Sequence, residues 1–130
     1  MNTVVVEDLI FSAEQRISQA EIQHGFVHPE LLSELQYLAR LYFSACEFEK
    51  ARDALWRILD IQQDQLGTED KSLAETLYLL AQAYESEQKI SLAEQLYLAA
   101  LSILDKSEDR VMDLLDRVLI GLSLLNRKAA

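Results

Sequence analysis

The chain has 130 residues, of which 50% are hydrophobic and 26% charged, and this length suits one globular domain. Three glycines and one proline are too few for the many turns of a sheet protein, so the composition favours helices with short connections. A formal net charge of −10 excludes the basic surface that nucleic-acid binding needs, and it disfavours binding to anionic lipid headgroups.

The acidic surplus has two interpretations: it keeps a small protein soluble, or it gives a preference for basic partners. Cys46 is the only cysteine, so an intramolecular disulfide is excluded. No segment is long and apolar enough to span a membrane, and the N-terminal stretch lacks the positive charge of a signal peptide because its first basic residue is Arg16. We therefore expect a cytoplasmic protein that does not bind membranes.

The first predicted helix covers residues 4–24. Leu9, Ala13 and Ile17 recur at the four-residue spacing that places apolar side chains on one helical face. Gly25 ends this segment, and Pro29 suits the first turn of the next helix.

A shift of 42 residues then superimposes the middle of the chain on itself. Leu35, Leu38, Ala39 and Tyr42 fall on Leu77, Leu80, Ala81 and Tyr84. Ala51, Leu55 and Leu59 fall on Ala93, Tyr97 and Leu101. The spacing is helical in all four stripes, and the second and fourth stripes each include one further residue, Ile58 and Ala100. We predict two helix pairs, at 29–66 and 70–105, with turns at 44–47 and 86–89.

In the same 42-residue register, the last segment, 107–126, aligns with the first helix of a pair. This predicts an inward-facing stripe of Leu115, Val118, Leu119 and Leu122. Further apolar residues surround the stripe: Leu114, Ile120, Leu124 and Leu125. A terminal repeat helix needs a polar outer face, so either these four residues serve self-association or partner docking, or the helix is tucked further into its own domain.

The order Leu-Ala, Tyr, Ala and a bulky residue, repeated at 42 residues, is similar to the tetratricopeptide repeat. Gly25-Phe26-Val27-His28-Pro29 resembles the entry of the longer variant found in kinesin light chains. The family often has glycine in the turn within the repeat, where Cys46 and Gln88 stand in this chain. A left-handed conformation at either residue would cost roughly 1 kcal/mol relative to glycine.

The resemblance implies an all-α fold, a right-handed α-solenoid of antiparallel helix pairs with six helices in a single domain, 1–130. It also implies a concave groove that binds a peptide or a helix of a partner protein and is lined by the first helix of each pair. The groove residues would be Ser33, Gln36, Tyr37, Arg40, Phe43, Glu75, Tyr78, Leu79, Gln82 and Glu85. The alternative is that these residues form only a solvated face.

Catalytic and metal-binding chemistry find little support in the sequence. His24 and His28 have the four-residue spacing of a helical metal site, but Gly25 and Pro29 place them around a loop, where capping or surface roles also explain them. Cys46 fits a turn residue better than a nucleophile. Trp56 lies just outside the inward stripe of its helix, and the pattern does not decide its partner. We expect no enzyme activity, metal or cofactor.

The sequence thus predicts a non-catalytic adaptor for a protein or peptide partner, with specificity from Tyr37, Arg40, Tyr78 and Gln82. The alternative function is a structural one, in which the chain forms a homodimer through its apolar C-terminal helix.

Overall fold

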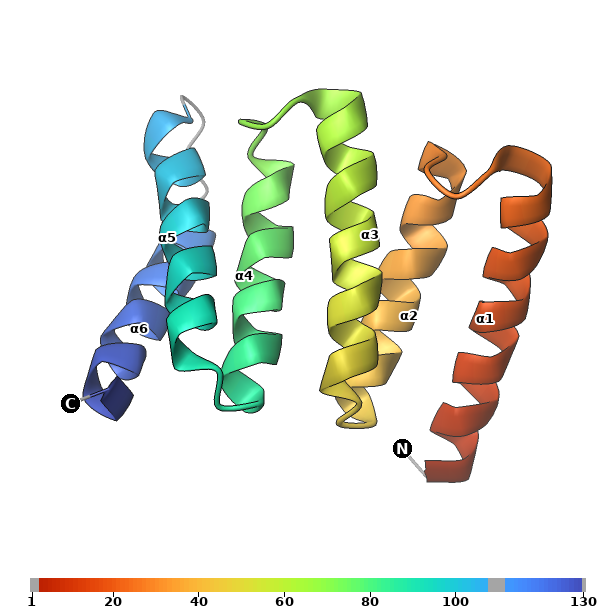
Figure 1. Cartoon of the computed structure of the whole chain (residues 1–130), viewed down its shortest axis with the longest axis horizontal. Helices are drawn as coiled ribbons and strands as arrows, with labels where there is room; N and C mark the ends of the chain where they lie inside the picture. The colour runs from red at the N-terminus through yellow and green to blue at the C-terminus, as the bar shows by residue number, and fades with distance from the viewer. Residues whose placement is uncertain (1–2, 108–111, 130) are drawn as a thin grey trace. The chain divides into compact units, whose positions relative to one another are not determined.

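The computed structural model describes residues 3–107 and 112–129 of the chain. Within these ranges it has six α-helices, one short 3-10 helix and no β-strand (Figure 1). The elements are α1 (Thr3–His24), η1 (Pro29–Leu31), α2 (Leu32–Ser44), α3 (Phe48–Leu66), α4 (Ser72–Ser86), α5 (Ile90–Lys106) and α6 (Met112–Ala129). The helices α2 and α3 run antiparallel, as do α4 and α5. The prediction of an all-α chain with six helices is confirmed.

The chain divides into two compact units, residues 1–65 and 66–130. The first unit contains α1, η1, α2 and almost all of α3, and the second contains α4, α5 and α6. The single domain with segments 4–24, 29–66, 70–105 and 107–126 stays a prediction, and residues 108–111 of its last segment lie outside the described residues.

Both helix pairs are joined by the same tight turn. Cys46 and Gln88 have positive φ angles of 58° and 64°. The backbone N–H of Glu47 donates to the carbonyl of Tyr42 at 2.9 Å, and that of Lys89 donates to Tyr84 at 2.9 Å. These bonds close the Schellman arrangement that ends a helix with a left-handed residue. The two turns therefore share one geometry despite having no glycine.

The predicted stripes form the core of the first unit. On α2 and α3 all eight residues are buried: Leu35, Leu38, Ala39, Tyr42, Ala51, Leu55, Ile58 and Leu59. On α1, which contacts α2, the buried residues are Val6, Ile10, Ala13 and Ile17, while Leu9 is only half-buried. The small residues Ala13, Ala39 and Ala51 let the helix axes approach closely.

The core of the second unit centres on Tyr97 of α5, which is 2% exposed. The predicted residues Leu77, Leu80, Ala81 and Tyr84 of α4 are buried, as are Ala93 and Ala100 of α5, whereas Leu101 is half-buried. Gly121 of α6 lies against the Tyr97 ring, because a Cβ atom at position 121 would stand 2.7 Å from Cζ of Tyr97. The Tyr97 ring of α5 and Gly121 of α6 are therefore complementary in shape.

The predicted inward stripe of α6 is partly wrong. Leu115 and Val118 are buried as expected, but Leu119 is 45% exposed. The buried face instead consists of Leu114, Leu115, Val118, Gly121 and Leu125. The reason is the packing of α6 on α5 through Gly121, which turns Leu119 away from the unit. The prediction came from the 42-residue register, in which Leu119 matches Leu77 of α4, and Leu77 is buried.

Candidate partner-binding surfaces

The exposed face of α2 carries five of the predicted groove residues. Ser33, Gln36 and Arg40 are exposed, and Tyr37 and Phe43 are half-buried. Their spacing of three or four residues places all five on the side of α2 opposite its buried stripe. We call these five residues the α2 face.

Two side-chain contacts, one ion pair and one pair of aromatic rings, lie at or beside the α2 face. The Nε atom of Arg16 in α1 donates to Oε1 of Glu34 at 3.0 Å, and this hydrogen bond raises the pKa of the guanidinium. The ring of Phe43 meets that of Phe48 edge to face, with centroids 5.9 Å apart. Among the described residues no ion pair engages the Arg40 guanidinium, so this cation remains available at the surface.

The corresponding residues of α4 make contacts within the second unit. Tyr78 is only 9% exposed, so most of its side chain lies inside the second unit. Its ring lies 5.9 Å from that of Tyr97, and the Arg117 guanidinium of α6 lies 5.4 Å from its centroid. Nε2 of Gln82 donates to the Tyr78 hydroxyl at 2.9 Å. The proximity of α5 and α6 thus accounts for the burial of Tyr78.

Glu85 of α4 has a similar internal role. It accepts a hydrogen bond from the Tyr97 hydroxyl at 2.9 Å and pairs with Nζ of Lys128 in α6 at 2.7 Å. Leu79 is half-buried, and Glu75 alone of the α4 set is exposed. Fewer of the predicted groove residues are therefore exposed on α4 than on α2.

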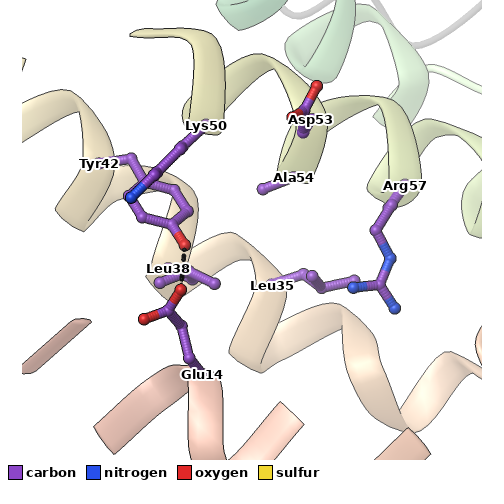
Figure 2. A pocket seen from close by; sticks show the side chains of 8 residues that line it. All are labelled: Glu14, Leu35, Leu38, Tyr42, Lys50, Asp53, Ala54 and Arg57. Carbon is purple, nitrogen blue, oxygen red and sulfur yellow. Dashed lines mark hydrogen bonds between the residues drawn. The ribbon is translucent and has the colours of Figure 1, made fainter. Parts of the chain in front are cut away.

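Sequence reasoning missed a pocket in the first unit (Figure 2). Its volume is about 270 Å³, and its lining comes from α1, α2 and α3: Glu14, Leu35, Leu38, Tyr42, Lys50, Asp53, Ala54 and Arg57. The leucines and Ala54 are apolar and read as core positions in the sequence, so no local signal distinguishes them. The pocket lies on the side of α2 opposite the α2 face.

The charged residues of this pocket balance one another. Tyr42 donates to Oε2 of Glu14 at 2.9 Å, and burial followed by this hydrogen bond raises the pKa of the tyrosine. Arg57 pairs with Glu21 at 3.5 Å, and Lys50 pairs with Glu47 at 3.5 Å. Two cations and two carboxylates line the pocket, so charge alone selects neither an anion nor a cation.

The other candidate residues occupy structural positions. His24 ends α1, His28 precedes η1, and their rings stack at 4.5 Å. Nδ1 of His28 accepts a hydrogen bond from the backbone N–H of Glu30 at 3.2 Å, as a helix cap does. Cys46 is exposed in its turn, and Trp56 is partly exposed on α3.

Among the residues that the structure describes, no group of three or more histidine, cysteine or acidic side chains is placed to hold a metal ion. None of the described helices combines the length and the hydropathy that crossing a membrane requires.

The comparison with known families agrees with this architecture. A family model described as tetratricopeptide repeat matches residues 31–106, which cover α2 to α5 and more than half of the chain. No curated protein matches the chain. The repeated helix pairs, their shared turn and this match lead to one conclusion: the chain belongs to the tetratricopeptide repeat family.

Proposed function

We propose that the protein is a non-catalytic interaction module that binds a peptide or a helix of a partner protein. Membership of the tetratricopeptide repeat family supports the role in protein–protein interaction. The observation that carries the proposal is the α2 face, where tyrosine, arginine and phenylalanine lie on one side of the same helix. These residue types are enriched in the parts of interfaces that contribute most binding energy.

Each residue of the α2 face has a distinct role in this proposal. The half-buried rings of Tyr37 and Phe43 offer apolar contact to a partner side chain at little cost in conformational entropy. Gln36 offers an amide that can both donate to and accept from a peptide backbone. Arg40 supplies the cation, and the net charge of −10 of the whole chain favours partners with basic segments.

The groove prediction for Glu75, Leu79, Gln82 and Glu85 stays a prediction, and the burial of Tyr78 reduces its support. We assign the main contribution to α2. A second candidate function, self-association through α6, is supported by the exposure of Ile120 and Leu124. The two other residues predicted to contribute, Leu114 and Leu125, are buried in the second unit and cannot form an exposed surface.

Comparative capture tests the proposed function. The wild-type chain, a Tyr37→Ala/Arg40→Ala variant and a Glu94→Ala/Gln95→Ala control would be immobilised and exposed to an extract of the source cells. The control changes two exposed residues of α5. We expect one partner to be retained by the wild type and the control and lost by the α2 variant.

The affinity of that purified partner then gives the quantitative result. Loss of two interface side chains of these types should weaken binding by roughly tenfold or more. If the α2 variant binds every recovered protein as well as the wild type does, the α2 face is not the binding surface and the proposal fails.

A further inference from the structure

The outward surface of α6 has an unusual share of exposed apolar side chains. Ile120 is 59% exposed, and Leu119 and Leu124 are each 45% exposed. Met112, in the first turn, is also exposed. These residues lie outside the face that α6 packs into its own unit. We call these four residues the α6 patch.

Charge is divided between the two ends of the same helix. Asp113 and Asp116 lie near its N-terminal end, and Arg127 and Lys128 lie in its last turn. All four side chains are exposed. Asp113 pairs with Arg117 at 3.3 Å, but the aspartate side chain remains 84% exposed, so this pair leaves it open to a second partner. Lys128 is already paired with Glu85, whereas Arg127 stands free of any ion pair within the described residues.

From this arrangement we infer that the α6 patch is an interface with a second copy of this chain, in which the two α6 helices pack antiparallel. Ile120 stands midway between Asp113 and Arg127, seven residues from each. At a rise of about 1.5 Å per residue, each charge lies roughly 10 Å from that midpoint. A two-fold axis near Ile120 therefore brings Asp113 of one copy next to Arg127 of the other, twice.

Charge complementarity favours both a second copy of this chain as the partner and the antiparallel orientation of the two α6 helices. An isologous interface must complement itself, and α6 does so only when the second helix is turned end to end. A parallel arrangement would place aspartate beside aspartate and arginine beside arginine. The inference rests on the second candidate function and gives it an orientation and a set of residues.

Sedimentation of the 130-residue chain over a roughly hundredfold range of concentration tests the association. We expect the wild type to pass from monomer to dimer within this range. Leu124→Glu should remain monomeric and keep its helical circular dichroism. Leu92→Glu on α5 is the matched control, because Leu92 is also 45% exposed, and it should dimerise like the wild type. A wild type that stays monomeric throughout overturns the inference, as does a Leu124→Glu variant that dimerises normally.

A charge exchange tests the direction. Asp113→Arg and Arg127→Asp, each alone, place like charges together in an antiparallel pair and should weaken the dimer roughly tenfold. The double variant restores opposite charges and should recover most of the wild-type affinity. If the double variant is as weak as the single variants while its helical content is unchanged, the antiparallel arrangement is wrong.

The result of the dimerisation test does not depend on the result of the capture experiment that tests the α2 face. Leu124 and Asp113 lie on α6, so the capture experiment with Tyr37 and Arg40 variants stands or falls without them. A monomeric wild type that still captures its partner would remove the self-association alone. A dimer without an α2-dependent partner would remove the adaptor function alone.

Discussion

Cys46 and Gln88 show how single residues carry strain in this protein. Both adopt the left-handed conformation at the end of a helix, where a Cβ atom is unfavourable. Both turns are nevertheless closed by the same pair of backbone hydrogen bonds, to Tyr42 and Phe43 in the first and to Tyr84 and Glu85 in the second. The core stripes on either side of each turn thus hold a residue in a conformation that it would rarely adopt alone.

Replacing Cys46 by glycine should therefore stabilise the protein by about 1 kcal/mol, since glycine adopts this conformation without a steric penalty. Urea denaturation of the wild type and Cys46→Gly gives the difference in the free energy of unfolding. Ser44→Gly, inside the last turn of α2, is the control and should be destabilising. A Cys46→Gly variant no more stable than the wild type would show that the turn is not strained.

Two buried tyrosines should make stability depend on pH in the alkaline range. Burial, together with a hydrogen bond to Glu14, raises the pKa of Tyr42, and burial with a hydrogen bond to Glu85 raises the pKa of Tyr97. An unfolded tyrosine ionises near pH ~10. Above that pH the unfolded chain loses protons that the folded chain keeps, so the free energy of unfolding falls as pH rises; below it these tyrosines contribute their full stabilisation.

Urea denaturation at a series of pH values measures this dependence. Relative to the wild type, a Tyr42→Phe/Tyr97→Phe variant should lose less stability as pH rises above ~10, because phenylalanine has no proton to lose. Parallel profiles for the two proteins would contradict the assignment.

At the scale of the helix, the contact between α5 and α6 depends on Gly121. Its missing side chain admits the buried Tyr97 ring, and a Cβ atom would stand under 3 Å from two ring carbons. Overpacking a well-filled core of this kind costs about 1–3 kcal/mol. Gly121→Ala should therefore lower the free energy of unfolding, although alanine is the better helix former.

Thermal and urea denaturation measure the effect of Gly121→Ala. Ser123→Ala, at an exposed position two residues further along α6, should change stability by less than about 0.5 kcal/mol. A stable Gly121→Ala variant would mean that α6 does not pack on Tyr97 as described.

The helices also show what the sequence could and could not predict. The stripes on α2, α3 and α4 were predictable because each consists of aliphatic or aromatic side chains at helical spacing and recurs after 42 residues, with alanine at matching places. Such a pattern identifies apolar positions, but it does not reveal which neighbour covers the remaining face. Tyr78 is amphipathic, so only the positions of Arg117 and Tyr97 decide that it is buried.

The same limit explains the misplacement on α6. Its leucines surround the helix, so several inward stripes fit the pattern equally well. Gly121 selects the observed one, because the Tyr97 ring of α5 occupies the space that a side chain at position 121 would need. The pocket beneath Tyr42 could not be foreseen either, since three helices must be placed before it exists.

For the whole molecule, the net charge of −10 and the α2 face support complementary parts of the proposed function. The charge favours encounter with basic partners and weakens as salt screens it. Aromatic contacts on α2 are much less sensitive to salt, so they would give the complex its affinity at physiological ionic strength.

Salt dependence separates these contributions in the captured complex. Between roughly 50 mM and 500 mM salt we expect the association rate with a basic partner to fall, while the dissociation rate changes little. Surface plasmon resonance gives both rates. An association rate that rises with salt would exclude a basic partner.

The most direct test of the central claim is a map of the binding surface by nuclear magnetic resonance. The ¹⁵N-labelled chain would be titrated with the partner that the capture experiment recovers. If the proposed function is correct, chemical-shift changes will concentrate on Ser33, Gln36, Tyr37, Arg40 and Phe43 of the α2 face. Changes confined to α6 or to the α1–α3 pocket, with the α2 face unaffected, would contradict it.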